Sequence, residues 1–157
     1  MPEPMHLDKN YQIALVINGS PFSQRKTRHW SIQLVDITVQ EELCLCKYHV
    51  VGASGSFIYR AEMDYDLKDS RYSYSIWCVI KVLIWVSLSC ASVLLKKVLG
   101  ILSPSQLNAF HQAIHEVPIN NADIEWNCQT FVMEIIYTLQ SASLVGPYTY
   151  SECAGLM

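Results

Sequence analysis

Apolar and polar residues alternate along short stretches in the first third of the chain. In "HWSIQLVDI", Trp30, Ile32 and Leu34 share one face and the residues between them share the other, which is the period of a half-buried strand. The stretches "YQIALVING", "LCLCKYHVVG" and "SFIYRAEMD" are also rich in strand-forming residues. We expect the last two to pair across 53–55. The pattern predicts an antiparallel meander.

The second half shows helical spacing instead. The segment "SPSQLNAFHQAIHEV" opens with Ser103 as N-cap, Pro104 at the first helical position and Gln106 three residues after the cap. In "EWNCQTFVMEIIYTL" a broad apolar stripe follows Cys128, which indicates a second helix. Strands first and helices later predict an α+β domain, with an antiparallel sheet of about four to six strands and about three helices.

Length and charge narrow the class of protein. The 157 residues predict a single domain, and we expect flexible ends at 1–10 and 146–157. The net charge is −3 and the 11 Lys and Arg residues are scattered, so we expect no nucleic-acid partner. The six cysteines include no C-x-x-C pair, so we predict no metal and no cofactor. The first residues do not resemble a secretory signal, which favours a reducing, cytoplasmic location.

One segment is far more apolar than the rest. Val82–Leu95 is an uninterrupted run of 14 residues, short of the roughly 20 that a membrane-spanning helix needs. Extending the run to Ile76 would place Lys81 inside the bilayer, which costs about 3 kcal/mol. We favour a buried strand and helix here. Weak membrane association through this run, or an insertion, are the alternatives.

Candidate chemistry centres on the cysteine that begins the second helix. Free N–H groups and the helix dipole at a helix start favour a thiolate, and so does an imidazolium partner. A thiol nucleophile also needs a base within hydrogen-bond reach. His29, at the start of a predicted strand, is 99 residues from Cys128 in the sequence, and a helix packed on a sheet could bring the two together. We therefore expect a lowered pKa at Cys128.

The fragments "HW", at the opening of a strand, and "NCQTFV", at the opening of an apolar helix, together resemble a known family. They are similar to the lecithin retinol acyltransferase-like branch of the NlpC-type, papain-like thiol fold. In that branch the fold is circularly permuted and the histidine precedes the cysteine, as here. The resemblance implies a thiol hydrolase or acyltransferase that works through a thioester acyl-enzyme on an ester or amide.

The resemblance also implies roles for individual residues. Cys128 matches the nucleophile and His29 the base, while His49 in "KYHVVG" is the best candidate for the third member, which orients the imidazole. Asn127 and Gln129 flank the nucleophile and could support it or the oxyanion. Gln129 stands where the acyltransferases commonly carry glutamate.

The substrate is expected to be a hydrophobic acyl compound or a peptide-like molecule. We assign Trp30, Trp126 and Phe131 to its pocket, although Trp126 and Phe131 are also typical residues to pack beneath such a site. Two other functions stay open: a small cysteine peptidase or isopeptidase, and a catalytically silent papain-like binding domain. His111 and His115 have the i, i+4 spacing of some zinc sites, but no third ligand is evident, so we expect an exposed helix face there.

Overall fold

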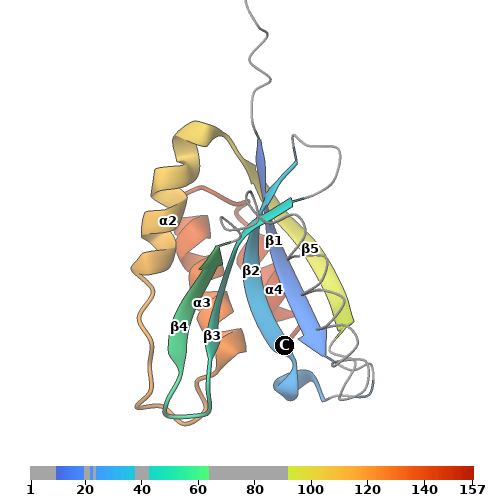
Figure 1. Ribbon diagram of the computed structural model, residues 1–157, viewed down its shortest axis with the longest axis vertical. Coiled ribbons are helices and arrows are strands. Elements are labelled where there is room, and N and C mark those ends of the chain that lie inside the picture. Colours follow the sequence, from blue (N-terminus) through green and yellow to red (C-terminus); the bar gives the residue numbers. More distant parts are fainter. Residues whose placement is uncertain (1–9, 20–21, 23, 38–42, 64–91) are drawn as a thin grey trace, which may run out of the picture.

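The computed structural model describes residues 10–19, 22, 24–37, 43–63 and 92–157. In these residues the fold is α+β, with one antiparallel sheet and three α-helices that follow it in the chain (Figure 1). The strands are β1 (Tyr11–Gly19), β2 (His29–Asp36), β3 (Leu43–Val51), β4 (Ile58–Met63) and β5 (Ser92–Leu102). The helices are the 3₁₀ turns η1 (Arg25–Thr27) and η3 (Pro104–Gln106), and α2 (Leu107–His115), α3 (Cys128–Ser141) and α4 (Thr149–Ala154).

The five strands of the sheet lie in the order β4-β3-β2-β1-β5. Each of the first three strands pairs with the next along the chain, so β1 to β4 form the predicted meander, and β5 pairs with β1 at the other edge. The turn between β3 and β4 needs Gly52, which has φ +117°, and an added Cβ there would meet the Ser56 carbonyl oxygen at 2.8 Å. The predicted number of strands is confirmed by the five observed.

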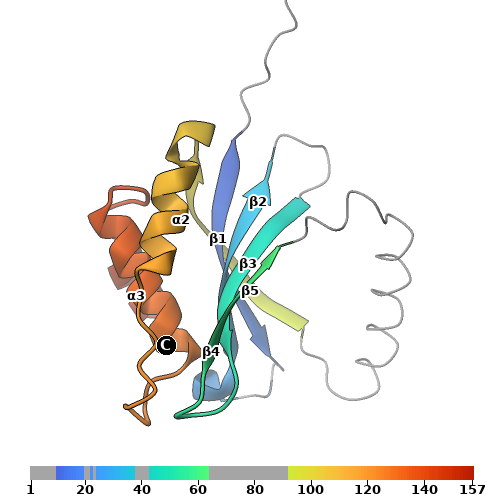
Figure 2. The ribbon, with the colours of Figure 1, turned by 60° about the vertical axis from the view of Figure 1, so that its left-hand side comes forward.

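The helices cover one face of the sheet, and the hydrophobic core lies between them (Figure 2). On β2 the alternation predicted from the sequence holds, because Trp30, Ile32 and Leu34 all belong to this core. The apolar stripe of α3 faces the same core, with Phe131 and Ile135 almost fully buried. These contacts fix α3 against the middle of the sheet.

The helix predicted after Ser103 is present as η3 followed by α2. Gln106 Oε1 accepts a hydrogen bond from the Ser103 backbone N–H at 2.9 Å, as expected for a helix start of this type. The α2 residues Phe110 and Ile114 are buried in the core. Both predicted helices are therefore confirmed.

The last residues of the chain differ from the prediction. We expected 146–157 to be flexible, but α4 forms within this range and packs against α3. Cys153 is 0% exposed, and the Glu152 carboxylate lies 3.1 Å from the Lys97 ammonium group on β5. The apolar contact and the ion pair hold a six-residue helix that would be too short to be stable alone.

The apolar run Val82–Leu95 lies mostly outside the described residues, and only 92–95 can be compared. These residues begin β5, a strand at the edge of the sheet. Val93 is 59% exposed, so this end of the run is a strand but is not buried as predicted. In the described part of the chain, no helix has the length and apolarity needed to cross a membrane.

Candidate active site

The start of α3 is built around the N-cap residue Asn127. Its side-chain oxygen accepts hydrogen bonds from the backbone N–H groups of Gln129 at 2.8 Å and Thr130 at 3.3 Å. Such a cap satisfies N–H groups that have no partner within the helix. Cys128 is the first residue of α3, so the predicted cysteine at a helix start is confirmed. Asn127 therefore caps the helix that begins with Cys128.

Gln129 joins this helix to the segment that leads into β2. Its side-chain Nε2 donates to the carbonyl oxygen of Arg25 at 2.6 Å and to that of Arg28 at 3.2 Å. The residue is only 3% exposed. Because an amide nitrogen has two hydrogens, both donors are occupied by the backbone of 25–28. Gln129 therefore holds residues 25–28, which precede His29, against the start of α3. Its side-chain amide is not available as an oxyanion donor.

The Cys128 thiol lies against the same segment. Its Sγ donates to the carbonyl oxygen of Arg28 at 3.7 Å, and Arg28 directly precedes His29 in the chain. The fold thus brings Cys128 to the residue next to His29 across a sequence separation of 100 residues. In the described part of the chain, however, no hydrogen bond joins the thiol to the His29 ring.

Burial controls the protonation of this thiol. Desolvation raises the pKa of Cys128, while the backbone N–H groups of Trp30, Cys128 and Gln129 act in the opposite direction. The lowered pKa expected from the sequence is therefore wrong for this structure. The physical reason is that the helix start lies under other parts of the fold, which a local motif does not reveal. The resting form is a protonated thiol.

His29 and His49 meet at one end of β2 and β3. His29 Nε2 lies 2.8 Å from His49 Nδ1, and the two rings are in an edge-to-face arrangement with centroids 5.1 Å apart. Ile32 pairs with Tyr48, and the same register continued by one residue sets His49 opposite Ser31. His29 lies two residues before Ser31 on the same face, so His29 and His49 are diagonal neighbours, within reach of each other's side chains. The structure thus brings together the two histidines that the sequence assigned to base and orienting residue.

Both rings are neutral near pH 7. The pKa of His29 is lowered to about 4, mainly by burial and then by the positive charge of His49 and of Lys47. The pKa of His49 is also lowered, chiefly by burial and next by Lys47. A neutral imidazole has one bare nitrogen and can accept a proton, as a general base must. The site therefore contains an un-ionised thiol and two un-ionised imidazoles, and not a thiolate with an imidazolium.

A carboxylate that the sequence analysis did not single out completes the group. Glu62 Oε1 lies 3.2 Å from His49 Nε2. His49 is 4% exposed, and the contact has the distance of an ion pair but not the angle of a well-aligned hydrogen bond. The pairing of Lys47 with Glu62 across β3 and β4 positions this carboxylate. Only the register of β3 against β4 could have predicted that Glu62 lies near His49.

The three aromatic residues assigned to a substrate pocket lie in the core. Trp30, Trp126 and Phe131 are all almost completely buried, and Trp126 stacks edge-to-face on Phe131 with centroids 5.9 Å apart. They pack beneath the start of α3 as core residues, and none of them lines the cavity described below, so that assignment is corrected. Their burial follows from helical and strand periodicity, which already placed Phe131 and Trp30 on core faces.

The loop before α3 is fixed to the turn between β3 and β4. Asn121 accepts a hydrogen bond from the Phe57 backbone N–H at 2.8 Å and donates to its carbonyl oxygen at 3.0 Å. Ser54 Oγ donates to the Ile124 carbonyl oxygen at 2.7 Å. These bonds hold the chain that leads into Cys128 against the same strands that carry His49 and Glu62.

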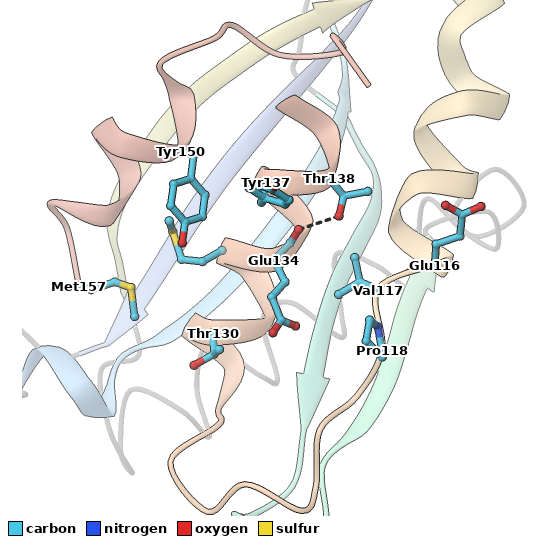
Figure 3. Close-up of a pocket in the computed structure, with 10 residues that line it drawn as sticks. Glu116, Val117, Pro118, Thr130, Glu134, Tyr137, Thr138, Tyr150 and Met157 are labelled. Carbon is cyan, nitrogen blue, oxygen red and sulfur yellow. Dashed lines mark hydrogen bonds between the residues drawn. The ribbon is translucent and has the colours of Figure 1, made fainter. Parts of the chain in front are cut away.

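A cavity of about 550 Å³ lies on the outer side of α3, away from the sheet (Figure 3). It is lined by Glu116, Val117, Pro118, Thr130, Met133, Glu134, Tyr137, Thr138, Tyr150 and Met157. The Trp126 indole N–H donates to both Glu134 carboxylate oxygens at 3.4 Å, and burial raises the pKa of Glu134. None of the candidate catalytic residues lines this cavity, so it is separate from the cysteine site.

The helix pair His111 and His115 has other neighbours. His111 Nδ1 lies 2.8 Å from the Tyr48 hydroxyl oxygen, and the His115 ring packs edge-to-face against Tyr59. His111 is only partly exposed, so the expected exposed face is correct for His115 and wrong for His111. Each ring is thus engaged with a tyrosine of the sheet.

The chain was compared with protein-family models, curated proteins and solved structures, and none of them matches it. The antiparallel α+β architecture is shown by the structure itself. The circularly permuted papain-like arrangement remains a prediction from "HW" and "NCQTFV". Function therefore has to be argued from the geometry of the site.

Proposed function

We propose that this protein is a cysteine-dependent hydrolase or acyltransferase that forms a thioester acyl-enzyme on an ester or amide substrate. Cys128 is the nucleophile, His29 the general base and His49 the residue that orients His29. The class of acyl group is a hydrophobic one, as the resemblance to the acyltransferase branch implies.

Two contacts carry the proposal: one joins the two histidine rings, and the other joins the Cys128 thiol to the residue before His29. His29 Nε2 is 2.8 Å from His49 Nδ1, and the Cys128 thiol is bonded to the carbonyl of the residue before His29. With Nε2 engaged by His49, Nδ1 is the ring nitrogen left for the thiol proton. Catalytic hydrogen bonds are often long or misaligned before substrate binds. A thiol that is hydrogen-bonded to the Arg28 carbonyl in place of His29 is therefore compatible with the proposal.

The reaction begins with transfer of the thiol proton to His29 Nδ1 while the sulfur attacks the carbonyl carbon. The carbonyl oxygen gains negative charge, and the backbone N–H of Cys128 at the helix start donates to it. Collapse breaks the bond to the leaving alcohol or amine, which takes the proton from His29. Water or an amine then attacks the thioester with His29 again as the base, which releases the acyl product and restores the thiol.

A second candidate is a catalytically silent domain used for binding. It is favoured by the raised pKa of Cys128 and by the thiol's hydrogen bond to Arg28 in place of His29. In that case the histidines and the helix start would be structural, and Cys128 would behave as a buried, inert thiol.

Trapping of the acyl-enzyme distinguishes these two candidates. The protein is incubated with p-nitrophenyl butyrate, quenched in acid and analysed by intact and peptide mass spectrometry. We expect one butyryl group on Cys128, and none in Cys128→Ala. Cys153→Ala is the matched control, because Cys153 is another free cysteine whose pKa is raised by burial, and this variant should acylate as the unchanged protein does.

The opposite result is equally clear. Absence of any acyl group on Cys128, together with a thiol that iodoacetamide does not alkylate at pH 8 in the folded protein, would contradict the enzyme proposal. The binding-domain candidate would then stand.

A further inference from the structure

The carboxylate of Glu62 lies where it can control both histidines of the site. On β3 and β4 the side chains of Lys47, His49, Arg60 and Glu62 share one face, because they alternate with residues of the core. Arg60 is directly opposite His49 and Lys47 directly opposite Glu62. Nevertheless the Glu62 carboxylate contacts His49 Nε2 at 3.2 Å.

The protons on the two rings follow from this contact. A neutral imidazole has one N–H and one bare nitrogen, and an ionised carboxylate only accepts hydrogen bonds. Next to Glu62, the proton of His49 is favoured on Nε2, which leaves Nδ1 bare. His49 Nδ1 can then only accept in the 2.8 Å contact with His29 Nε2, so His29 must carry its proton on Nε2.

One carboxylate thereby specifies the tautomer of a ring that it does not touch. With its proton on Nε2, His29 has a bare Nδ1, which is the form that a general base for the thiol requires. Without Glu62, the reverse arrangement, in which His49 Nδ1–H donates to His29 Nε2, would put the His29 proton on Nδ1 and disable the base.

We infer that Glu62 is a positioning residue, which acts through His49 to keep Nδ1 of His29 unprotonated. The assignment of a catalytic purpose to this arrangement rests on the function proposed above, whereas the tautomers themselves do not. Other charges near the two rings are Lys47 and Arg60. Both disfavour a proton on His49, whereas Glu62 favours it, so Glu62 is the one charged neighbour in the described residues that attracts an imidazole N–H.

The tautomers can be measured directly on ¹⁵N-labelled protein near pH 7. Two-dimensional ¹H–¹⁵N spectra of the imidazole rings distinguish a protonated from a bare ring nitrogen, and His29→Gln and His49→Gln provide the assignments. We expect the Nε2–H form for both His29 and His49 in the unchanged protein. An Nδ1–H form at His49 would overturn the inference, whatever the enzyme does.

Variants at Glu62 test the cause. Glu62→Leu should shift both rings toward mixed tautomers and slow the butyrylation of Cys128 about tenfold, the lower end of what an outer partner of a histidine contributes. Glu62→Gln keeps an oxygen acceptor, so it should retain the tautomers and most of the rate while lowering the pKa of His49. Glu152→Leu is the matched control, because Glu152 is an ion-paired carboxylate with 57% side-chain exposure against 52% for Glu62.

The outcomes separate the inference from the function. If the rings follow Glu62 but no ester acylates Cys128, the proposed function fails and the tautomer control stands. If Cys128 acylates but Glu62→Leu leaves both tautomers and the rate unchanged, the proposed function stands and the inference is overturned.

Discussion

The molecule contains two pairs of histidines that differ in what each ring contacts. His29 and His49 come from neighbouring strands, and their rings bond to each other at 2.8 Å. His111 and His115 come from one helix, α2, and each ring instead meets a tyrosine of the sheet. In the first pair, His29 directly follows Arg28, whose carbonyl oxygen accepts the hydrogen bond of the Cys128 thiol. The second pair lies at the interface of α2 with β3 and β4.

The two pairs differ in whether a ring can exchange a proton with the side chain that it contacts. In the strand pair, the partner of each ring is itself titratable, so a change of proton at one ring alters the other. In the helix pair, the partners are tyrosine side chains, and burial raises the pKa of Tyr59 to about 12. A tyrosine of this kind holds a ring in place but does not exchange its proton near pH 7. The histidines close in sequence, His111 and His115, therefore have structural contacts, whereas His29 and His49, which are distant in sequence, form the pair that can share a proton.

Removing one ring from each pair should give the largest difference between the two pairs in the rate of acylation of Cys128. His29→Ala deletes the proposed general base, and acyl-enzyme formation at Cys128 should fall about 100-fold or more. His115→Ala removes an exposed residue of the other pair and should change the rate by no more than about twofold. The measurement is the initial rate of butyrylation at pH 7, with far-ultraviolet circular dichroism as a check on folding. Equal losses in the two variants would remove the distinction between the pairs.

The pH dependence of stability should sharpen the same comparison. The pKa of His29 is lowered to about 4 in the folded protein, whereas its ordinary value is 6.5, so the unfolded chain binds protons first as the pH falls. The stabilising contribution is complete above pH 6.5 and is lost as the pH decreases toward 4. With allowance for the partial exposure of the ring, we expect a loss of about 1 kcal/mol between pH 7 and pH 5.

Urea unfolding at the two pH values measures this loss. His29→Gln should flatten the dependence by most of that amount. His111→Gln should flatten it less: the pKa of His111 is also lowered, mainly by burial and then by the charge of His115, but water reaches this partly exposed ring more easily. A larger effect from His111→Gln would contradict the assignment of the stronger coupling to the strand pair.

Much of the fold could be predicted from sequence patterns that involve only residues close together in the chain. The strands β1 to β4 have strand-forming composition and turn residues, and α3 has an asparagine cap directly before a helical apolar stripe. Because such patterns depend on neighbours in the chain, they placed Cys128 at a helix start and His29 and His49 on adjacent strands. Their roles, and the choice of His49 above all, came from the resemblance carried by "HW" and "NCQTFV" and remain predictions.

The missed features depend on contacts between distant residues. Strand β5 carries no alternation around Lys96 and Lys97, and it is held by pairing with β1. Helix α4 is short and is held by packing on α3 and by the ion pair of Glu152 with Lys97. The role of Glu62 depends on the register of β3 against β4. The raised pKa of Cys128 depends on its burial, which the helix-start motif alone does not predict.

The smallest expected effect comes from the tyrosine that holds the helix pair. Tyr48→Phe removes the hydroxyl that lies 2.8 Å from His111 Nδ1 and keeps the ring that packs in the core. Because His111 is partly exposed, water can replace the lost partner, and we expect a destabilisation of about 0.5 kcal/mol, at the low end for a hydrogen bond. Urea unfolding measures this change, and the butyrylation rate of Cys128 should stay within about twofold. A large loss of rate in Tyr48→Phe would mean that the two histidine pairs communicate through β3, where Tyr48 directly precedes His49, and the separation drawn between them would then fail.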